Sequence, residues 1–64
     1  MKVKVEKCFG DLPEYLTMCK LYEVFDYDKE NDFGYIIDDM GYEITFKRCG
    51  SAHLNYGSWE IVSE

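Results

Sequence analysis

Alternation of apolar and polar residues with a period of two is the most regular pattern in this chain. Residues 2–8, KVKVEKC, place Val3 and Val5 on one face and charged side chains on the other, and residues 42–46, YEITF, repeat the alternation. A period of two is typical of a half-buried β-strand. Together with three further β-branched or aromatic segments, it predicts strands at residues 2–8, 20–28, 35–38, 42–46 and 59–63.

The segment 20–28, KLYEVFDYD, is the longest of these predicted strands. Successive side chains of a regular strand point to opposite faces, so one face carries Leu21, Glu23, Phe25 and Tyr27 and the other Tyr22, Val24, Asp26 and Asp28. A long connection, 9–19, precedes this strand and a polar turn, 29–34, follows it. We expect a single helical turn within residues 49–58, which are mostly small and polar.

Two neighbouring acids, Asp38 and Asp39, stand just before Gly41 between two predicted strands. Gly41 can adopt the positive φ of a three-residue hairpin loop, and Asp39 can accept a hydrogen bond from the backbone further along. The alternative is a metal-binding or catalytic loop. A calcium loop, however, spreads its oxygen ligands over about twelve residues, and adjacent strand residues point to opposite faces. The sequence therefore predicts a hairpin turn at residues 39–41.

The order of these parts resembles an SH3-like barrel. Residues 9–19 correspond to its first large loop, residues 29–34 to its second, and residues 39–41 to its distal hairpin. A chain of 64 residues forms one domain, 1–64, and closing a short sheet into a barrel hides its edges. The resemblance implies an all-β fold, a small SH3-like five-stranded barrel with one short helical turn before the last strand.

A more local resemblance covers residues 16–46 and concerns small SH3-like proteins encoded by phages and prophages. Their pattern is a Leu-Thr-x-Gly-Lys-x-Tyr-x-Val strand followed by a Tyr-x-Ile-x-Asp-x-Gly hairpin. The matching residues here are Leu16, Thr17, Lys20, Tyr22, Val24, Tyr35, Ile37, Asp39 and Gly41. Cys19 stands where that pattern has glycine, which puts the turn before the second strand in doubt. The resemblance implies a phage-like origin and a binding role.

Charge is distributed unevenly along the chain. The net charge is −6, but residues 1–22 carry four lysines against three acids, and residues 44–64 carry two cations against two acids. Residues 23–43 hold eight acids and one lysine, and therefore the whole negative excess. Such a face repels a phosphate backbone and attracts a basic surface. A solvated face that only keeps the protein in solution is the simpler interpretation.

The three cysteines and the single histidine are the candidate ligands and nucleophiles. Cys8, Cys19, Cys49 and His53 could form a Cys₃His zinc site, although only the spacing from Cys49 to His53 suits one. Cys49 and His53 as a nucleophile pair need an orienting third group. We expect neither metal nor cofactor nor enzymatic activity. An odd cysteine count without a CxxC pair, and the absence of an apolar signal core, predict reduced thiols and a cytoplasmic location.

Two other binding classes fit parts of the sequence. A basic edge of Lys2, Lys4, Lys7, Lys47 and Arg48 with interleaved aromatics suits single-stranded nucleic acid, which the acidic centre disfavours. Proline-rich peptides bind aromatic-lined grooves, but the Ala-Leu-Tyr-Asp-Tyr and paired-Trp motifs are missing. Leu12, Tyr15, Leu16, Leu54 and Tyr56 either cap the barrel ends or form the apolar centre of an interface.

These observations favour a small acidic phage-type protein that binds a basic surface of a bacterial host protein or nucleoprotein complex. The binding sterically inhibits the target, as in an anti-CRISPR, anti-defence or nucleic-acid-mimicking inhibitor, without direct nucleic-acid or membrane contact. The expected contacts are the central acids with two tyrosine anchors: Asp26, Tyr27, Asp28, Glu30, Asp32, Tyr35, Asp38, Asp39 and Glu43. The alternative is a structural, assembly or peptide-binding SH3-like module that forms a homodimer or larger homo-oligomer.

Overall fold

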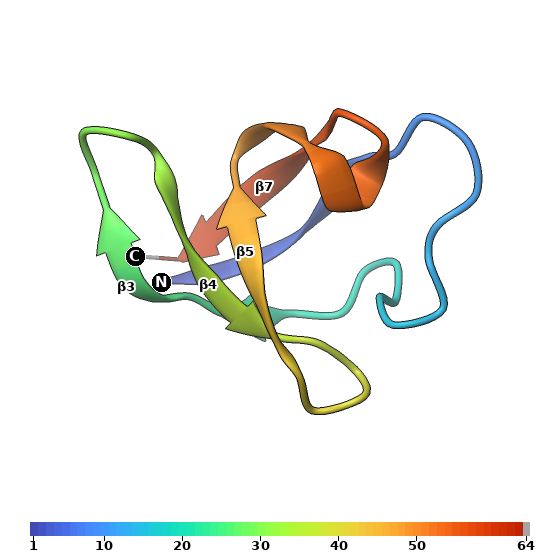
Figure 1. Ribbon diagram of the computed structural model, residues 1–64, viewed down its shortest axis with the longest axis horizontal. Helices are drawn as coiled ribbons and strands as arrows, with labels where there is room; N and C mark the ends of the chain where they lie inside the picture. The colour runs from blue at the N-terminus through green and yellow to red at the C-terminus, as the bar shows by residue number, and fades with distance from the viewer. Residues whose placement is uncertain (64) are drawn as a thin grey trace.

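Residues 1–63, the part of the chain that the computed structural model describes, contain seven short strands and one 3₁₀ helix. The elements are β1 (Lys2–Lys7), β2 (Tyr22–Glu23), β3 (Phe25–Asp28), β4 (Phe33–Ile37), β5 (Glu43–Lys47), β6 (Cys49–Ser51), η1 (Ala52–Leu54) and β7 (Gly57–Ser63). They form two antiparallel sheets, ordered β2-β1-β7-β6 and β3-β4-β5 (Figure 1). The all-β expectation is confirmed.

Two stretches of chain leave one sheet and enter the other. The predicted strand 20–28 is divided at Val24 into β2 and β3, and the predicted strand 42–46 appears as β5 and continues past Arg48 into β6. Backbone hydrogen bonds hold both bends. Val24 N–H donates to the Met1 carbonyl at 2.8 Å, and Trp59 N–H donates to the Arg48 carbonyl at 2.9 Å. Neither sheet closes on itself, so the expected closed five-stranded barrel is not shown.

A bulge in β3 reverses the face that Tyr27 occupies. Asp26 has a φ of 51°, and the pairing register of β3 with β4 shifts between Phe25 and Asp28. Such an extra residue turns the following side chains to the other face. Phe25 therefore lies on the outer face beside Tyr35, whereas Tyr27 packs inward against Phe46. The prediction that Phe25 and Tyr27 share a face is wrong, because a local left-handed residue interrupts the period of two.

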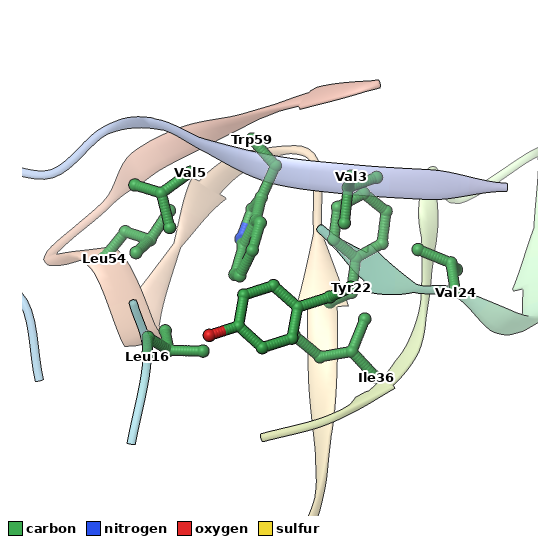
Figure 2. Close-up of a cluster of buried hydrophobic side chains, with 9 residues drawn as sticks. Val3, Val5, Leu16, Tyr22, Val24, Ile36, Leu54 and Trp59 are labelled. Carbon is green, nitrogen blue, oxygen red and sulfur yellow. The ribbon is translucent and has the colours of Figure 1, made fainter. Parts of the chain in front are cut away.

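The core fills the space between the two sheets, and Trp59 of β7 lies at its centre. Its indole packs edge-on between the rings of Tyr22 and Phe46, at centroid distances of 5.9 and 5.7 Å. Figure 2 shows the core side chains around Trp59, with the Tyr22 hydroxyl turned toward Leu16. The buried hydrophobic residues are Val3, Val5, Leu16, Tyr22, Val24, Ile36, Phe46, Leu54 and Trp59.

The long connection between β1 and β2 is fastened to the body of the protein. Among the five apolar residues expected to cap the barrel ends or form an interface, Leu16 and Leu54 are buried, Leu12 and Tyr15 pack against the core, and Tyr56 is 75% exposed. Four of these five loop residues thus cap the core. The Tyr15 hydroxyl also hydrogen-bonds His53 Nδ1 at 2.8 Å. A search of residues 1–63 for a helix of membrane-spanning length and hydropathy finds none.

Candidate protein-binding surface

Three aromatic rings lie together on the outer face of the β3-β4-β5 sheet. Strand β4 directs Gly34 and Ile36 into the core, so Phe33, Tyr35 and Ile37 point outward. The ring of Tyr35 contacts that of Phe25 at 6.1 Å and that of Phe33 at 5.4 Å, the latter edge-on. We name Phe25, Phe33, Tyr35 and Ile37 the outer aromatic face. The three rings are half-buried, because they cover one another, and Ile37 is 47% exposed.

Exposed acids lie on the strands and the turn next to this face. Asp26 follows Phe25 in β3, Glu43 of β5 is paired with Ile37, and Glu30 lies in the turn that leads to β4. All three are exposed, and no hydrogen bond or ion pair ties their carboxylates to the rest of residues 1–63. An aromatic centre with a charged rim is the usual arrangement of a protein-binding surface.

Asp38 is occupied within its own hairpin. Its carboxylate accepts hydrogen bonds from Met40 N–H and Tyr42 N–H, both at 2.9 Å, and its side chain is buried. The backbone closes the turn with Gly41 N–H on the Asp38 carbonyl, and Gly41 has a φ of 85°. The predicted hairpin and its glycine are confirmed. The prediction that Asp39 accepts the turn-stabilising hydrogen bond is wrong. Asp38 accepts it, because the loop begins one residue earlier.

Asp39 points the other way and holds the long connection. Its carboxylate accepts hydrogen bonds from Thr17 Oγ1 and Lys20 Nζ at 2.5 Å and from the Tyr22 hydroxyl at 2.9 Å. Its N–H donates to the Tyr15 carbonyl at 2.9 Å. The hydrogen bonds from Lys20 and then Thr17 lower the pKa of Asp39 from 3.8 to about 2. This carboxylate therefore supports the fold and is not free for a partner.

Asp28 and Asp32 stabilise the turn between β3 and β4. Asp28 accepts hydrogen bonds from Asn31 Nδ2 at 2.6 Å and from Glu30 N–H at 3.0 Å, and the Asn31 bonds are the main cause of its lowered pKa. Asp32 accepts a hydrogen bond from the Tyr27 hydroxyl. The polar turn is shorter than predicted, because Phe33 already pairs with Asp28 and Lys47, so β4 begins at Phe33 instead of residue 35.

A depression of about 430 Å³ lies beside this turn. Its lining consists of Met1, Tyr27, Lys29, Asp32, Arg48 and Ile61. This lining carries both signs of charge, from Lys29, Arg48 and Asp32. Tyr27 and Asp32 therefore lie at this depression and not on the outer aromatic face.

The structure thus separates the nine expected contact residues into two groups. Tyr35 belongs to the outer aromatic face and is half-buried, whereas Asp26, Glu30 and Glu43 lie beside this face with exposed side chains. The others have internal partners or interior positions: Tyr27, Asp28, Asp32, Asp38 and Asp39. Sequence reasoning missed Phe25, Phe33 and Ile37 as surface residues. The signal was present, since apolar residues on both faces of a strand indicate that the second face is also covered or used.

The three cysteines and the histidine do not come together in one site. Cys8, Cys19 and Cys49 are free thiols, and within residues 1–63 no three histidine, cysteine, aspartate or glutamate side chains cluster as metal ligands. His53 faces Tyr15 and not Cys49. Cys19 has a φ of 68°, a left-handed conformation that glycine adopts without strain.

Known proteins offer no further assignment. No protein-family model, curated protein or solved structure matches this chain.

Proposed function

We propose that this protein is a non-enzymatic binding module that docks on a basic protein surface through its outer aromatic face. This proposal rests mainly on the ring cluster of Phe25, Tyr35 and Phe33. The cluster faces outward and lies within residues 23–43, the segment that holds the excess negative charge. Aromatic side chains that become desolvated at the centre of an interface supply most of its binding energy. Surrounding charges mainly raise the association rate and select the partner.

The arrangement of the strands also supports a binding module. We propose that the five continuous runs, 2–7, 22–28, 33–37, 43–51 and 57–63, form an SH3-like barrel in which the second and fourth runs bend between sheets. The long connection, the distal hairpin at Gly41 and the 3₁₀ helix before the last strand occur in the order of that fold. A small rigid barrel of this kind is suited to presenting one docking face.

The narrower proposal concerns the partner. A bacterial host protein or nucleoprotein complex whose basic surface is occupied, and thereby inhibited, fits the acidic segment and the resemblance to phage proteins. The left-handed Cys19, at the glycine position of that pattern, supports the resemblance at the residue where it was in doubt.

The test compares capture by the protein and by matched variants. We expect immobilised protein to capture a basic partner from bacterial lysate at low salt and less of it at high salt. With the purified partner, Tyr35→Ala should weaken binding roughly 30-fold, about 2 kcal/mol, because it removes the central anchor. Asp26→Asn with Glu30→Gln should slow association several-fold and reduce its salt dependence.

The control variants remove a tyrosine and an acid that lie outside the outer aromatic face. Tyr56→Ala removes an exposed tyrosine between η1 and β7, and Glu14→Gln removes an exposed acid from the long connection. Both should bind as the parent protein does, and thermal unfolding checks that each variant is folded. Equal losses in Tyr35→Ala and Tyr56→Ala, or capture that salt does not affect, contradict the proposal.

A further inference from the structure

Strand β5 has an open edge. In the order β3-β4-β5 it pairs with β4 alone, in an unbroken register from Phe33↔Lys47 to Ile37↔Glu43. No backbone hydrogen bond joins residues 43–47 to any part of residues 1–63 outside this hairpin. A regular open edge is able to pair with another strand, and natural proteins either protect it or use it.

The hydrogen-bond pattern shows which residues face this open edge. Asp38 N–H bonds the Tyr42 carbonyl at 2.9 Å, so Tyr42 directs its backbone groups toward β4. In an antiparallel ladder, the residues alternate between bonded and non-bonded pairs. Glu43, Thr45 and Lys47 therefore direct both N–H and C=O away from β4, and their side chains are exposed.

These three residues are complementary to themselves. If a second β5 runs antiparallel beside the first with Thr45 opposite Thr45, each Glu43 lies opposite a Lys47. All three facing pairs are then of the hydrogen-bonded kind, with two backbone bonds each. Opposite charges directly across two strands stabilise the pairing, whereas like charges destabilise it.

We propose that two copies of this protein associate through their β5 edges, centred on Thr45, into one continuous six-stranded sheet. The other edge strands are unsuited to this: β2 has two residues, β6 three with a shifted register, and β3 contains the bulge at Asp26. The two-fold axis lies perpendicular to the sheet, so both outer aromatic faces lie on the same side. The contact is far smaller than a standard interface of roughly 800 Å² per partner, so the dimer is weak.

Charge reversal tests this register. Sedimentation equilibrium of the parent protein should give a mass that rises from 7.6 kDa toward twice that value with concentration. Glu43→Lys and Lys47→Glu should each weaken association about tenfold, because both facing pairs then repel. An equimolar mixture of the two variants should restore association, since the lysine introduced at position 43 faces the glutamate introduced at position 47.

A backbone variant tests the edge itself. Thr45→Pro removes an N–H that β4 does not use, and should abolish the dimer, whereas Thr45→Val should retain it. Circular dichroism checks that each variant is folded, and the charge-reversal mixture decides the question if Thr45→Pro does not fold. A parent mass of 7.6 kDa at all concentrations up to about 1 mM overturns the proposal. So does a mixture no more associated than its parts. The substitutions differ from those that test partner docking, so either proposal can fail alone.

Discussion

At the scale of single residues, two neighbouring aspartates have different structural tasks. Asp38 accepts the backbone N–H groups of its own turn, while Asp39 accepts hydrogen bonds from side chains that lie 17 to 22 residues away. Their side chains diverge because consecutive residues point to opposite sides of the chain. The pair that most resembled a ligand site in the sequence is therefore a structural junction between the hairpin and the long connection.

The depressed pKa of Asp39 predicts a specific loss of stability in acid. Because the folded-state pKa of about 2 lies below the ordinary 3.8, the stabilisation is complete above about pH 4 and disappears as pH falls toward 2. We expect Asp39→Asn to be less stable than the parent protein at pH 7 and to show a flatter stability curve between pH 4 and 2. Urea unfolding across this range measures the effect. Parallel curves for the two proteins would falsify the assignment, and Glu14→Gln, at an exposed acid, serves as control.

At the scale of elements, the turn that leads into β2 depends on a cysteine in a glycine-like conformation. The turn is closed by Lys20 N–H on the Thr17 carbonyl at 3.4 Å, and Cys19 has a φ of 68°. A residue with a Cβ is strained there by roughly 1–2 kcal/mol, whereas glycine is not. The same turn carries the Thr17 and Lys20 side chains that bind Asp39.

Cys19→Gly should therefore stabilise the protein by about 1 kcal/mol, since it relieves the strain at a small entropic cost. The denaturation midpoint in urea should rise without a change in slope. Cys49→Gly is the matched control. Position 49 lies in β6 without a positive φ, so glycine there should cost about 0.5–1 kcal/mol. Equal effects at both positions would show that the backbone conformation is not the cause.

At the scale of the whole molecule, the first and last strands hold the fold together. β1 lies between β2 and β7, and Val3 and Val5 of β1 pair with Ile61 and Trp59 of β7. Where this pairing ends, Gly57 passes close to β1. A Cβ at position 57 would lie 1.8 Å from the Lys7 carbonyl oxygen and 2.7 Å from its carbon. No side chain fits between the two backbones.

Gly57→Ala should consequently separate β1 from β7 and leave the protein largely unfolded at 25 °C, because a domain this small has only a few kcal/mol to lose. Gly50→Ala tests the interpretation: position 50 has a φ of 69° but open space around it. This variant should stay folded and lose about 1–2 kcal/mol. Thermal unfolding followed by circular dichroism compares the two, and a cooperative transition of Gly57→Ala near that of the parent protein contradicts the steric argument.

The sequence alone determined the features that depend on near neighbours in the chain. The period of two located the strands of an all-β fold, and Gly41 located the hairpin, because side-chain alternation and turn chemistry act over a few residues. The excess of negative charge in residues 23–43 was also evident from the sequence.

Only the tertiary structure decided which side chains are free for a partner. Asp39 and Tyr27 looked available, but one is held by Thr17 and Lys20 and the other is turned inward by the bulge at Asp26. Such contacts join residues distant in sequence, or depend on one left-handed backbone residue, and no local pattern contains them. The availability of a surface side chain is thus set by packing, whereas the strand that carries it is set by sequence.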